Sequence, residues 1–356
     1  MEDLLQEDYV QLLRRLIATP RHSREEGQAA DLMEETMRRW GLVPQRLGNN
    51  LWLTDPSHDD RRPTLLLNAH IDTVRPVASW TRSPYSPDIE DDRLYGLGSN
   101  DCGGGLVTLL HTFRRLTACG QDGLRRPWNL VYLASCEEEV SGKNGIESVI
   151  KSGLLPRIDV AVVGEPTGLQ PATAEKGLMV VDAVAHGKSG HAARGEGVNA
   201  LYEALDDLCF VRDYKFDRVS PLLGPTVMQA TIIQAGTQHN VVPDECHFTL
   251  DVRTNELYSN EEVISFLQSH MKSQLTARST RLCSSRIAED HPLVCRCRQL
   301  GLTPFGSPTL SDQALMPWPS LKLGPGQSAR SHSADEYICL SELQAAVRLY
   351  TTLLSE

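Results

Sequence analysis

Histidine and carboxylate side chains follow three apolar runs of the sequence, at the point where each run would end as a strand. In an open α/β sheet, ligands bind at the carboxyl ends of the strands. Because parallel strands end at the same edge of a sheet, we expect these side chains to lie close together. The runs and the residues after them are Thr64–Asn68 with His70 and Asp72, Leu130–Ala134 with Glu137–Glu139, and Val160–Val163 with Glu165.

Two further residues complete the candidate set. Asp101 stands just before three glycines and an apolar-periodic segment, Leu106–Leu116, so it can face the same edge. His332 stands just before the last predicted helix. A lone histidine or acidic residue is ordinarily a surface or core residue, and it is the joint placement at strand ends that favours a function.

Imidazoles and carboxylates without thiolates suit a catalytic site for Zn²⁺ or Co²⁺ better than a structural zinc site. Three carboxylates (Asp101, Glu139 and Glu165) and one hydroxide would carry four negative charges, which balance two divalent ions if the histidines bind neutral. Such a pair of ions lowers the pKa of a shared water and polarises a carbonyl. The sequence therefore predicts a hydrolase with two divalent metal ions.

Two acidic residues near the predicted metal ligands are not themselves assigned as ligands. Asp72 is two residues from His70, hence on the same face of an extended strand, and we expect it to orient the imidazole. The remaining glutamate of the triplet can serve as the general base that then delivers a proton to the leaving amine.

Composition limits the class of protein. The chain has 356 residues, which suggests about two domains at roughly 150 residues each. A net charge of −11 argues against a nucleic-acid partner. No apolar stretch approaches the roughly 18 residues of a membrane helix. The acidic start of the chain lacks the features of a signal peptide, and nine cysteines show no repeated disulfide spacing, so we expect a cytoplasmic protein without a membrane partner.

The spacing of apolar residues divides the chain into two regions with different secondary-structure patterns. Up to about residue 172, apolar strands alternate with helical segments, which is typical of a mainly parallel α/β sheet. From about 175, the runs alternate like antiparallel strands, with helical segments near 198–211 and 260–275, which indicates an inserted α+β unit. A closing helix is predicted over 334–355, with Ser333 and Glu336 spaced as a capping box. We expect a catalytic domain in two segments (1–172 and 283–356) and an inserted domain over 173–282.

The sequence resembles the dizinc aminoacylase and carboxypeptidase family, and within it the acetylornithine deacetylase-like enzymes. The resemblance covers nearly the whole chain in the right order. The matching segments are Asn68–Asp72, Gly98–Gly104, Glu137–Glu139, Val163–Pro166, Gly190–Ala193, Asn240–Asp244, Asp251–Arg253, Gly324–Gly326 and Ser331–Glu336.

The resemblance assigns roles to the candidate residues. His70 and Glu165 match ligands of one metal, and Glu139 and His332 match ligands of the other. Asp101 matches the bridging carboxylate. Glu138 then matches the general base, with Gly145 at a familiar distance downstream. A register shifted by one, with Glu137 as base and Glu138 as ligand, stays open.

The inserted domain resembles the family's lid and dimerisation domain, so we expect a homodimer. His191 matches a histidine that reaches the partner subunit's active site and stabilises the oxyanion, a task for which imidazole is a competent donor. Asn240 and Arg253 match residues that hold the substrate, and a guanidinium suits a two-pronged pair with a carboxylate.

The resemblance implies hydrolysis of the amide of an N-acyl amino acid, a small-molecule substrate. We expect N-acetylornithine, N-acetylcitrulline or N-succinylornithine, in arginine biosynthesis. A dipeptidase, a carboxypeptidase or a succinyl-diaminopimelate desuccinylase is the alternative, and a non-catalytic binding protein of the same fold is a remote one. A nucleotide site is disfavoured because Gly96–Gly98 lacks the third glycine and precedes the negative Asp101. A serine hydrolase is disfavoured because Gly-x-Ser-x-Gly is absent.

Overall fold

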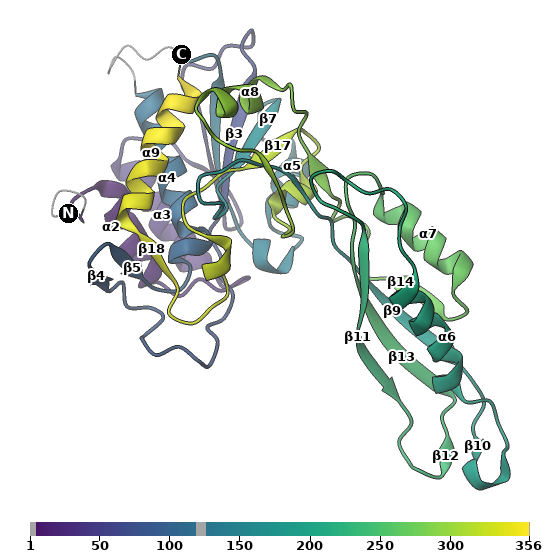
Figure 1. Cartoon of the computed structure of the whole chain (residues 1–356). Helices are drawn as coiled ribbons and strands as arrows, with labels where there is room; N and C mark the ends of the chain where they lie inside the picture. Colours follow the sequence, from purple (N-terminus) through teal and green to yellow (C-terminus); the bar gives the residue numbers. More distant parts are fainter. Residues whose placement is uncertain (1–4, 119–125, 356) are drawn as a thin grey trace. The chain divides into compact units, whose positions relative to one another are not determined.

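The computed structural model describes residues 5–118 and 126–355, which form two units (Figure 1). Unit 1 contains residues up to Thr173 together with Ile287–Phe305 and from Ser311 onward. Unit 2 contains Ala174–Arg286 and Gly306–Leu310. The chain thus enters unit 2 one residue after the predicted boundary and leaves it four residues later than expected. Unit 2 also takes the short segment Gly306–Leu310 from the second catalytic segment.

Unit 1 is built on a large, mainly parallel sheet, which confirms the predicted fold class. The order of the sheet is β1-β2-β6-β3-β7-β17-β8-β15, with β16 paired to β8, and β15 and parts of β8 and β16 belong to unit 2. The four central strands, β6, β3, β7 and β17, are parallel to one another. The pairs that flank them, β1-β2, β2-β6, β17-β8 and β8-β15, are antiparallel. The strands are β1 (Gln45–Leu47), β2 (Asn50–Thr54), β3 (Thr64–His70), β6 (Asn129–Ser135), β7 (Val160–Val163), β8 (Ala172–Glu175), β15 (Ser285–Arg286), β16 (Phe305–Ser307) and β17 (Ser320–Lys322).

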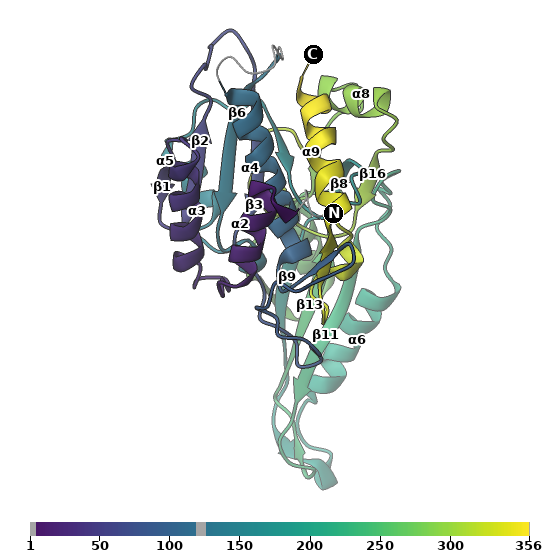
Figure 2. The same ribbon diagram turned by 90° about the vertical axis from the view of Figure 1, so that its left-hand side faces the viewer.

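Helices cover both faces of this sheet (Figures 1 and 2). One face packs against α2 (Asp8–Ile17), α3 (Gly27–Arg39), α4 (Gly104–Thr117) and α9 (Leu340–Leu354), and the other against α5 (Ile146–Ser152). Strands β3 and β6 are buried along their whole length because both faces are covered. A three-stranded sheet, β18-β5-β4, adds β4 (Ile89–Glu90), β5 (Arg93–Tyr95) and β18 (Tyr337–Cys339), and α8 spans Pro292–Gln299.

The closing helix begins later than its sequence pattern predicts. Helix α9 begins at Leu340, where Cys339 and Glu342 form the capping box. The predicted box of Ser333 and Glu336 does not form, because Glu336 accepts hydrogen bonds from the backbone of Gly98, Asn100 and Asp101 instead. The predicted helix over 260–275 also ends early, at His270, and a short strand follows it.

Unit 2 is an antiparallel sheet with two helices. Its order is β11-β13-β9-β14, from β11 (Val227–Ala235), β13 (Glu245–Arg253), β9 (Met179–His186) and β14 (Gln274–Ala277). Residues of β9 and β13 alternate between buried and more exposed, and the buried ones join α6 (Ala200–Asp213) and α7 (Asn260–His270) in a separate core. Strands β10 (Gly190–His191) and β12 (Val241–Val242) pair with each other.

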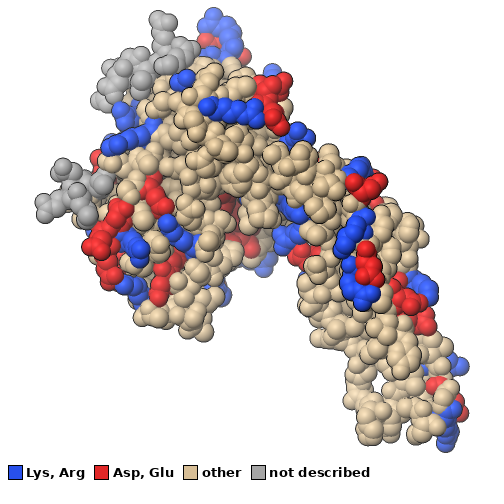
Figure 3. All heavy atoms as spheres, in the orientation of Figure 1, with Lys and Arg blue, Asp and Glu red and all other residues tan. Residues whose placement is uncertain are grey.

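Acidic and basic side chains are interspersed on the face that Figure 3 shows. Within the described residues, no helix is both long enough and apolar enough to span a bilayer.

Candidate active site

The strand ends of unit 1 bring together the predicted histidine and carboxylates. His70 is the last residue of β3, Glu139 follows β6, and Glu165 comes two residues after β7. Asp101 lies in a short turn of helix, Ser99–Gly103, immediately before α4. His332 reaches the same place from the segment before β18, with a left-handed backbone (φ 57°).

Asp101 lies between the two histidines. Its Oδ1 is 3.2 Å from His70 Nε2, and its Oδ2 is 3.6 Å from His332 Nε2. Each histidine also has a second carboxylate neighbour. Glu165 Oε1 is 3.6 Å from His70 Nε2, and Glu139 Oε2 is 2.9 Å from His332 Nε2. The five residues therefore form two half-sites that share one carboxylate.

The cluster is buried on one side and open on the other. His70 is 1% exposed, whereas the His332 side chain is 55% exposed. The Glu165 Oε1 atom is buried and has no hydrogen-bond partner. Burial and the neighbouring Asp101 raise the pKa of Glu165 to about 8, against the opposing effect of His70. A buried carboxylate oxygen without a donor, beside two other carboxylates, fits the role of a cation ligand.

Asp72 contacts the His70 imidazole, as expected, but the shorter contact is made by its main-chain carbonyl and not by its side chain. His70 Nδ1 is 2.9 Å from the main-chain carbonyl of Asp72 and 3.6 Å from its carboxylate. The carboxylate accepts instead the backbone N–H groups of Glu138 and Glu139, each at 3.1 Å, and the hydroxyl of Ser23 at 2.7 Å. Asp72 thus fixes the imidazole through its backbone and the glutamate loop through its side chain.

The three glutamates of the triplet have different surroundings. Glu137 has a left-handed backbone (φ 55°), and its carboxylate accepts hydrogen bonds from the side chain and backbone N–H of Asn144. Glu139 contacts His332. Burial raises the pKa of Glu138 well above its usual range, His70 opposes that shift, and the Glu165 carboxylate adds to it. This arrangement favours Glu138 over Glu137 as the proton-accepting group.

His191, Asn240 and Arg253 belong to unit 2, and their approach to the cluster stays a prediction. His191 is exposed and caps a short turn, where its Nδ1 accepts from the backbone of Ala193 at 3.2 Å. Asn240 is exposed in the loop before β12. Arg253 ends β13 and makes two hydrogen bonds to Asp251, at 2.7 and 3.0 Å.

Sequence patterns missed several buried polar residues around the cluster. Asp312 accepts from the Ser135 hydroxyl at 2.6 Å, and burial raises its pKa to about 6. Arg21 and Glu336 contact the turn that carries Asp101. None of these residues follows an apolar run, so the pattern that identified the ligands gave no signal for them.

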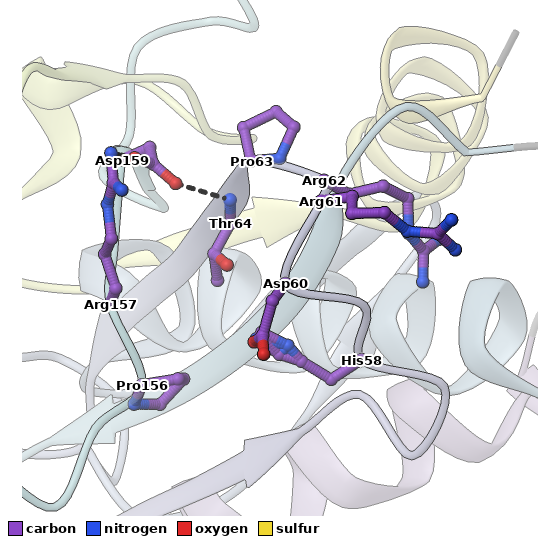
Figure 4. Close-up of a pocket in the computed structure, with 9 residues that line it drawn as sticks. All are labelled: His58, Asp60, Arg61, Arg62, Pro63, Thr64, Pro156, Arg157 and Asp159. Atoms are coloured by element: carbon purple, nitrogen blue, oxygen red, sulfur yellow. Dashed lines mark hydrogen bonds and ion pairs between the residues drawn. The ribbon is translucent and has the colours of Figure 1, made fainter.

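A depression of about 570 Å³ lies at the other end of β3. It is a weaker candidate for a functional site than the histidine and carboxylate cluster. Two of the guanidinium groups there are already paired, since Arg157 contacts Asp159 at 2.8 Å and Arg61 contacts Asp59 at 2.7 Å. Figure 4 shows the guanidinium groups of Arg61 and Arg62 pointing away from His58 and Asp60. No set of donors or acceptors converges there.

Comparison with known proteins places the chain in a family. A sequence model described as peptidase family M20/M25/M40 matches residues 66–356. The chain belongs to this family. The M20 chain is thereby one of the metal-dependent peptidases and amidohydrolases.

Solved structures share the fold at low sequence identity. A tripeptidase from Staphylococcus aureus is 19% identical with a TM-score of 0.76, over 97% of this chain and 96% of that one. An M20 family metallo-carboxypeptidase from Sulfolobus solfataricus is 18% identical with a TM-score of 0.76, over 98% and 99%. A dinuclear metal binding peptidase of the M20 family from Bacillus subtilis is 16% identical with a TM-score of 0.74, over 99% and 98%.

Proposed function

We propose that this M20 chain is a dinuclear metal-dependent amidohydrolase that removes the acyl group from an N-acyl amino acid. The observation that carries the proposal is the position of Asp101, whose two oxygens face two histidines that each have a second carboxylate beside them.

The donor set supports two divalent ions, Zn²⁺ or Co²⁺. His70 and Glu165 would hold one ion, Glu139 and His332 the other, and Asp101 would be shared. Nitrogen and oxygen donors of this kind suit catalytic zinc. The unpartnered oxygen of Glu165 would gain a partner on binding. When bound, the ions supply a water of lowered pKa and polarisation of the scissile carbonyl.

The chain's own residues handle the proton. Glu138 stands beside the cluster, with its backbone N–H held by the Asp72 carboxylate at 3.1 Å. It accepts the proton of the attacking water and delivers it to the leaving nitrogen, and burial suits it to this role because burial raises the pKa of the carboxyl group. His191 from unit 2 stabilises the oxyanion.

The substrate assignment to N-acetylornithine, N-acetylcitrulline or N-succinylornithine, and hence to arginine biosynthesis, is supported by the sequence resemblance. Asn240 and Arg253 would hold the amino-acid portion. A substrate carboxylate must then compete with Asp251 for the Arg253 guanidinium. A dipeptidase, tripeptidase or carboxypeptidase activity is the second candidate, because structures that share the fold are described as a tripeptidase and a carboxypeptidase.

The test combines metal analysis with hydrolysis assays on the purified chain. We expect close to two divalent ions per chain and hydrolysis of N-acetyl- or N-succinylornithine or N-acetylcitrulline. The panel also includes N-succinyl-diaminopimelate and simple dipeptides. Turnover of N-succinyl-diaminopimelate alone would keep the deacylation and change the substrate, whereas turnover confined to dipeptides would move the assignment to the second candidate. Well under one ion per chain, with no hydrolysis, would leave a non-catalytic protein of the same fold.

We also propose a homodimer formed through unit 2. Strand β11 is the edge strand of its sheet, and Val227, Ile232 and Ile233 on it are at least 40% exposed. An unpaired apolar edge strand readily adds a strand from a second chain, and the side of unit 2 where β11 runs is mostly uncharged (Figures 1 and 3).

The dimer is tested by Ile232→Lys, because a charge on the edge strand blocks strand pairing. We expect a monomer by sedimentation, whereas the matched Val43→Lys variant, at an exposed valine of unit 1, keeps the dimer. A wild-type monomer, or an Ile232→Lys dimer, would refute pairing at β11.

A cytoplasmic location is part of the same proposal. Its support is that the eight cysteines the structure describes are all free thiols, as expected in a reducing compartment.

A further inference from the structure

The turn that carries Asp101 is held by a buried carboxylate from the far end of the chain. Glu336 is 2% exposed. It accepts three backbone hydrogen bonds, from Gly98 at 2.9 Å, Asn100 at 2.8 Å and Asp101 at 2.9 Å. Every one of these donors lies within three residues of the Asp101 carboxylate, so the position of that side chain depends on Glu336.

A buried guanidinium holds the same turn from the other side. Arg21 is 2% exposed and donates to the carbonyl of Gly98 and to the carbonyl of Ile71, both at 2.8 Å. Ile71 directly follows His70, so Arg21 ties the end of β3 to the turn before α4. The approach is close: Gly98 has φ 72°, and a Cβ there would lie 2.5 Å from the Arg21 guanidinium.

Burying one cation and one anion in this way is costly, and hydrogen bonds offset part of that cost. Three donors converge on Glu336, and Arg21 reaches two carbonyls on separate segments. Both sets of contacts end on main-chain atoms next to His70 and Asp101, the residues whose side chains approach within 3.2 Å of each other. Arg21 and Glu336 therefore help to set the distance between the His70 and Asp101 side chains.

We propose that Arg21 and Glu336 are positioning residues, which fix the Asp101 carboxylate so that one oxygen faces His70 and the other faces His332. This inference rests on the proposed dinuclear site. Removing either residue is expected to weaken the shared coordination first, because Asp101 is the only residue of the cluster placed in both half-sites.

The experiment measures metal binding rather than turnover. Wild-type, Glu336→Gln and Arg21→Lys chains are loaded with Mn²⁺, and the affinities and the electron paramagnetic resonance spectrum are recorded. Glutamine keeps the shape of Glu336 but presents an N–H group to one of the three donors. Lysine keeps the charge of Arg21 but cannot reach two carbonyls in a fork. We expect two ions with spin-coupled signals in the wild type.

For either variant we expect a loss of roughly 10–100-fold in affinity for the more weakly bound ion, the usual effect of removing a residue that orients a metal ligand. The spin coupling should weaken in parallel. If one of the two variants, Glu336→Gln or Arg21→Lys, fails to fold, the other still tests the proposal.

Glu342→Gln is the matched control. Glu342 lies on the same C-terminal segment, accepts the backbone N–H of Cys339 at 2.9 Å and pairs with Arg330 at 2.8 Å, but it does not contact the Asp101 turn. We expect it to lower the melting temperature and to leave both metal affinities within about twofold, a change too small to signal a lost ligand contact.

Two results would overturn the inference: wild-type affinity and coupling in the Glu336 and Arg21 variants, or an equal loss in the Glu342 control. A wild-type chain that binds fewer than two ions would refute the proposed function itself. That outcome is visible before any variant is compared.

Discussion

Glu137 and Glu138 are neighbours in the chain, yet their carboxylates serve different structures. The Glu137 carboxylate accepts a hydrogen bond from Asn144 within its own loop, whereas the Glu138 carboxylate interacts electrostatically with His70 and Glu165 of the cluster. We expect Glu138→Gln to keep both metal ions and to lose roughly 10²–10⁴-fold in kcat, the usual contribution of a general base.

The comparison variant is Glu137→Gln. It weakens hydrogen bonds to Asn144, so we expect a loss of about 1–2 kcal/mol in the free energy of unfolding, with kcat retained. Activity assays and denaturant titrations on both variants measure the two effects. The reverse result, with kcat lost only in the Glu137 variant, would establish the shifted register.

Metal binding should release a proton from Glu165. Because burial and Asp101 raise its pKa to about 8 in the metal-free chain, this carboxyl is protonated at pH 7 and must lose its proton to become a ligand. His332 must also lose a proton, because its hydrogen bond with Glu139 raises its pKa to about 9, so the apparent metal affinity should rise with pH up to about 9. Calorimetry at pH 7 in two buffers of different ionisation enthalpy measures the release. An identical enthalpy in both buffers would contradict the prediction.

At the scale of elements, the packing of α2 on α4 buries an uncharged histidine. His111 lies 4.8 Å from the ring of Tyr9, and its Nδ1 is buried without a partner. Burial, with Arg114 and Arg115 nearby, lowers its pKa to about 4. The unfolded chain, with a pKa near 6.5, therefore binds this proton more readily.

Stability should consequently fall as the pH drops from about 6.5 to 4, by roughly 3 kcal/mol from this group, since its pKa is lowered from 6.5 to about 4 and each pKa unit corresponds to about 1.4 kcal/mol. His111→Gln should reduce this part of the pH dependence in unfolding experiments. An unchanged profile would show that His111 is not buried in its neutral form.

The start of α4 approaches the end of β7 at a glycine. A Cβ on Gly105 would lie 1.7 Å from the carbonyl oxygen of Gly164, the residue before Glu165. We expect Gly105→Ala to lower the free energy of unfolding by about 1–3 kcal/mol through overpacking, and to weaken metal binding because Glu165 is displaced. Thermal unfolding with and without metal separates the two effects, and an unchanged melting temperature would contradict this account.

His70 and Glu336 show which parts of the site could be predicted from the sequence and which could not. His70 stands at the end of a seven-residue buried strand, and a local pattern of apolar residues was enough to predict its position. Glu336 lies in an equally suggestive local pattern, the Ser-x-x-Glu of a capping box, but its partners are 235 or more residues away. Local patterns fix strands and their ends, while the partners of buried charges depend on tertiary contacts that no short pattern encodes.

At the scale of the whole molecule, the predicted role of His191 requires two chains. We expect His191→Ala to cut turnover without unfolding the protein, because His191 is exposed and only caps a short turn. If each active site uses the partner's histidine, mixing this variant with Glu138→Ala should restore activity, since a mixed dimer contains one site with both residues intact. Absence of rescue in a mixture shown to exchange subunits would contradict the prediction.

The two ends of the main segment of unit 2 pair with each other at the edge of the catalytic sheet. Residues 174 and 175 of β8 pair in antiparallel register with residues 286 and 285 of β15. The main insertion is therefore an enlarged hairpin loop, whose ends stay one strand spacing apart whatever lies between them. A segment attached in this way can lengthen, shorten or be exchanged for a foreign sequence during evolution while the order of the metal-binding strands is kept. New substrate preferences could thus be grafted at this single junction.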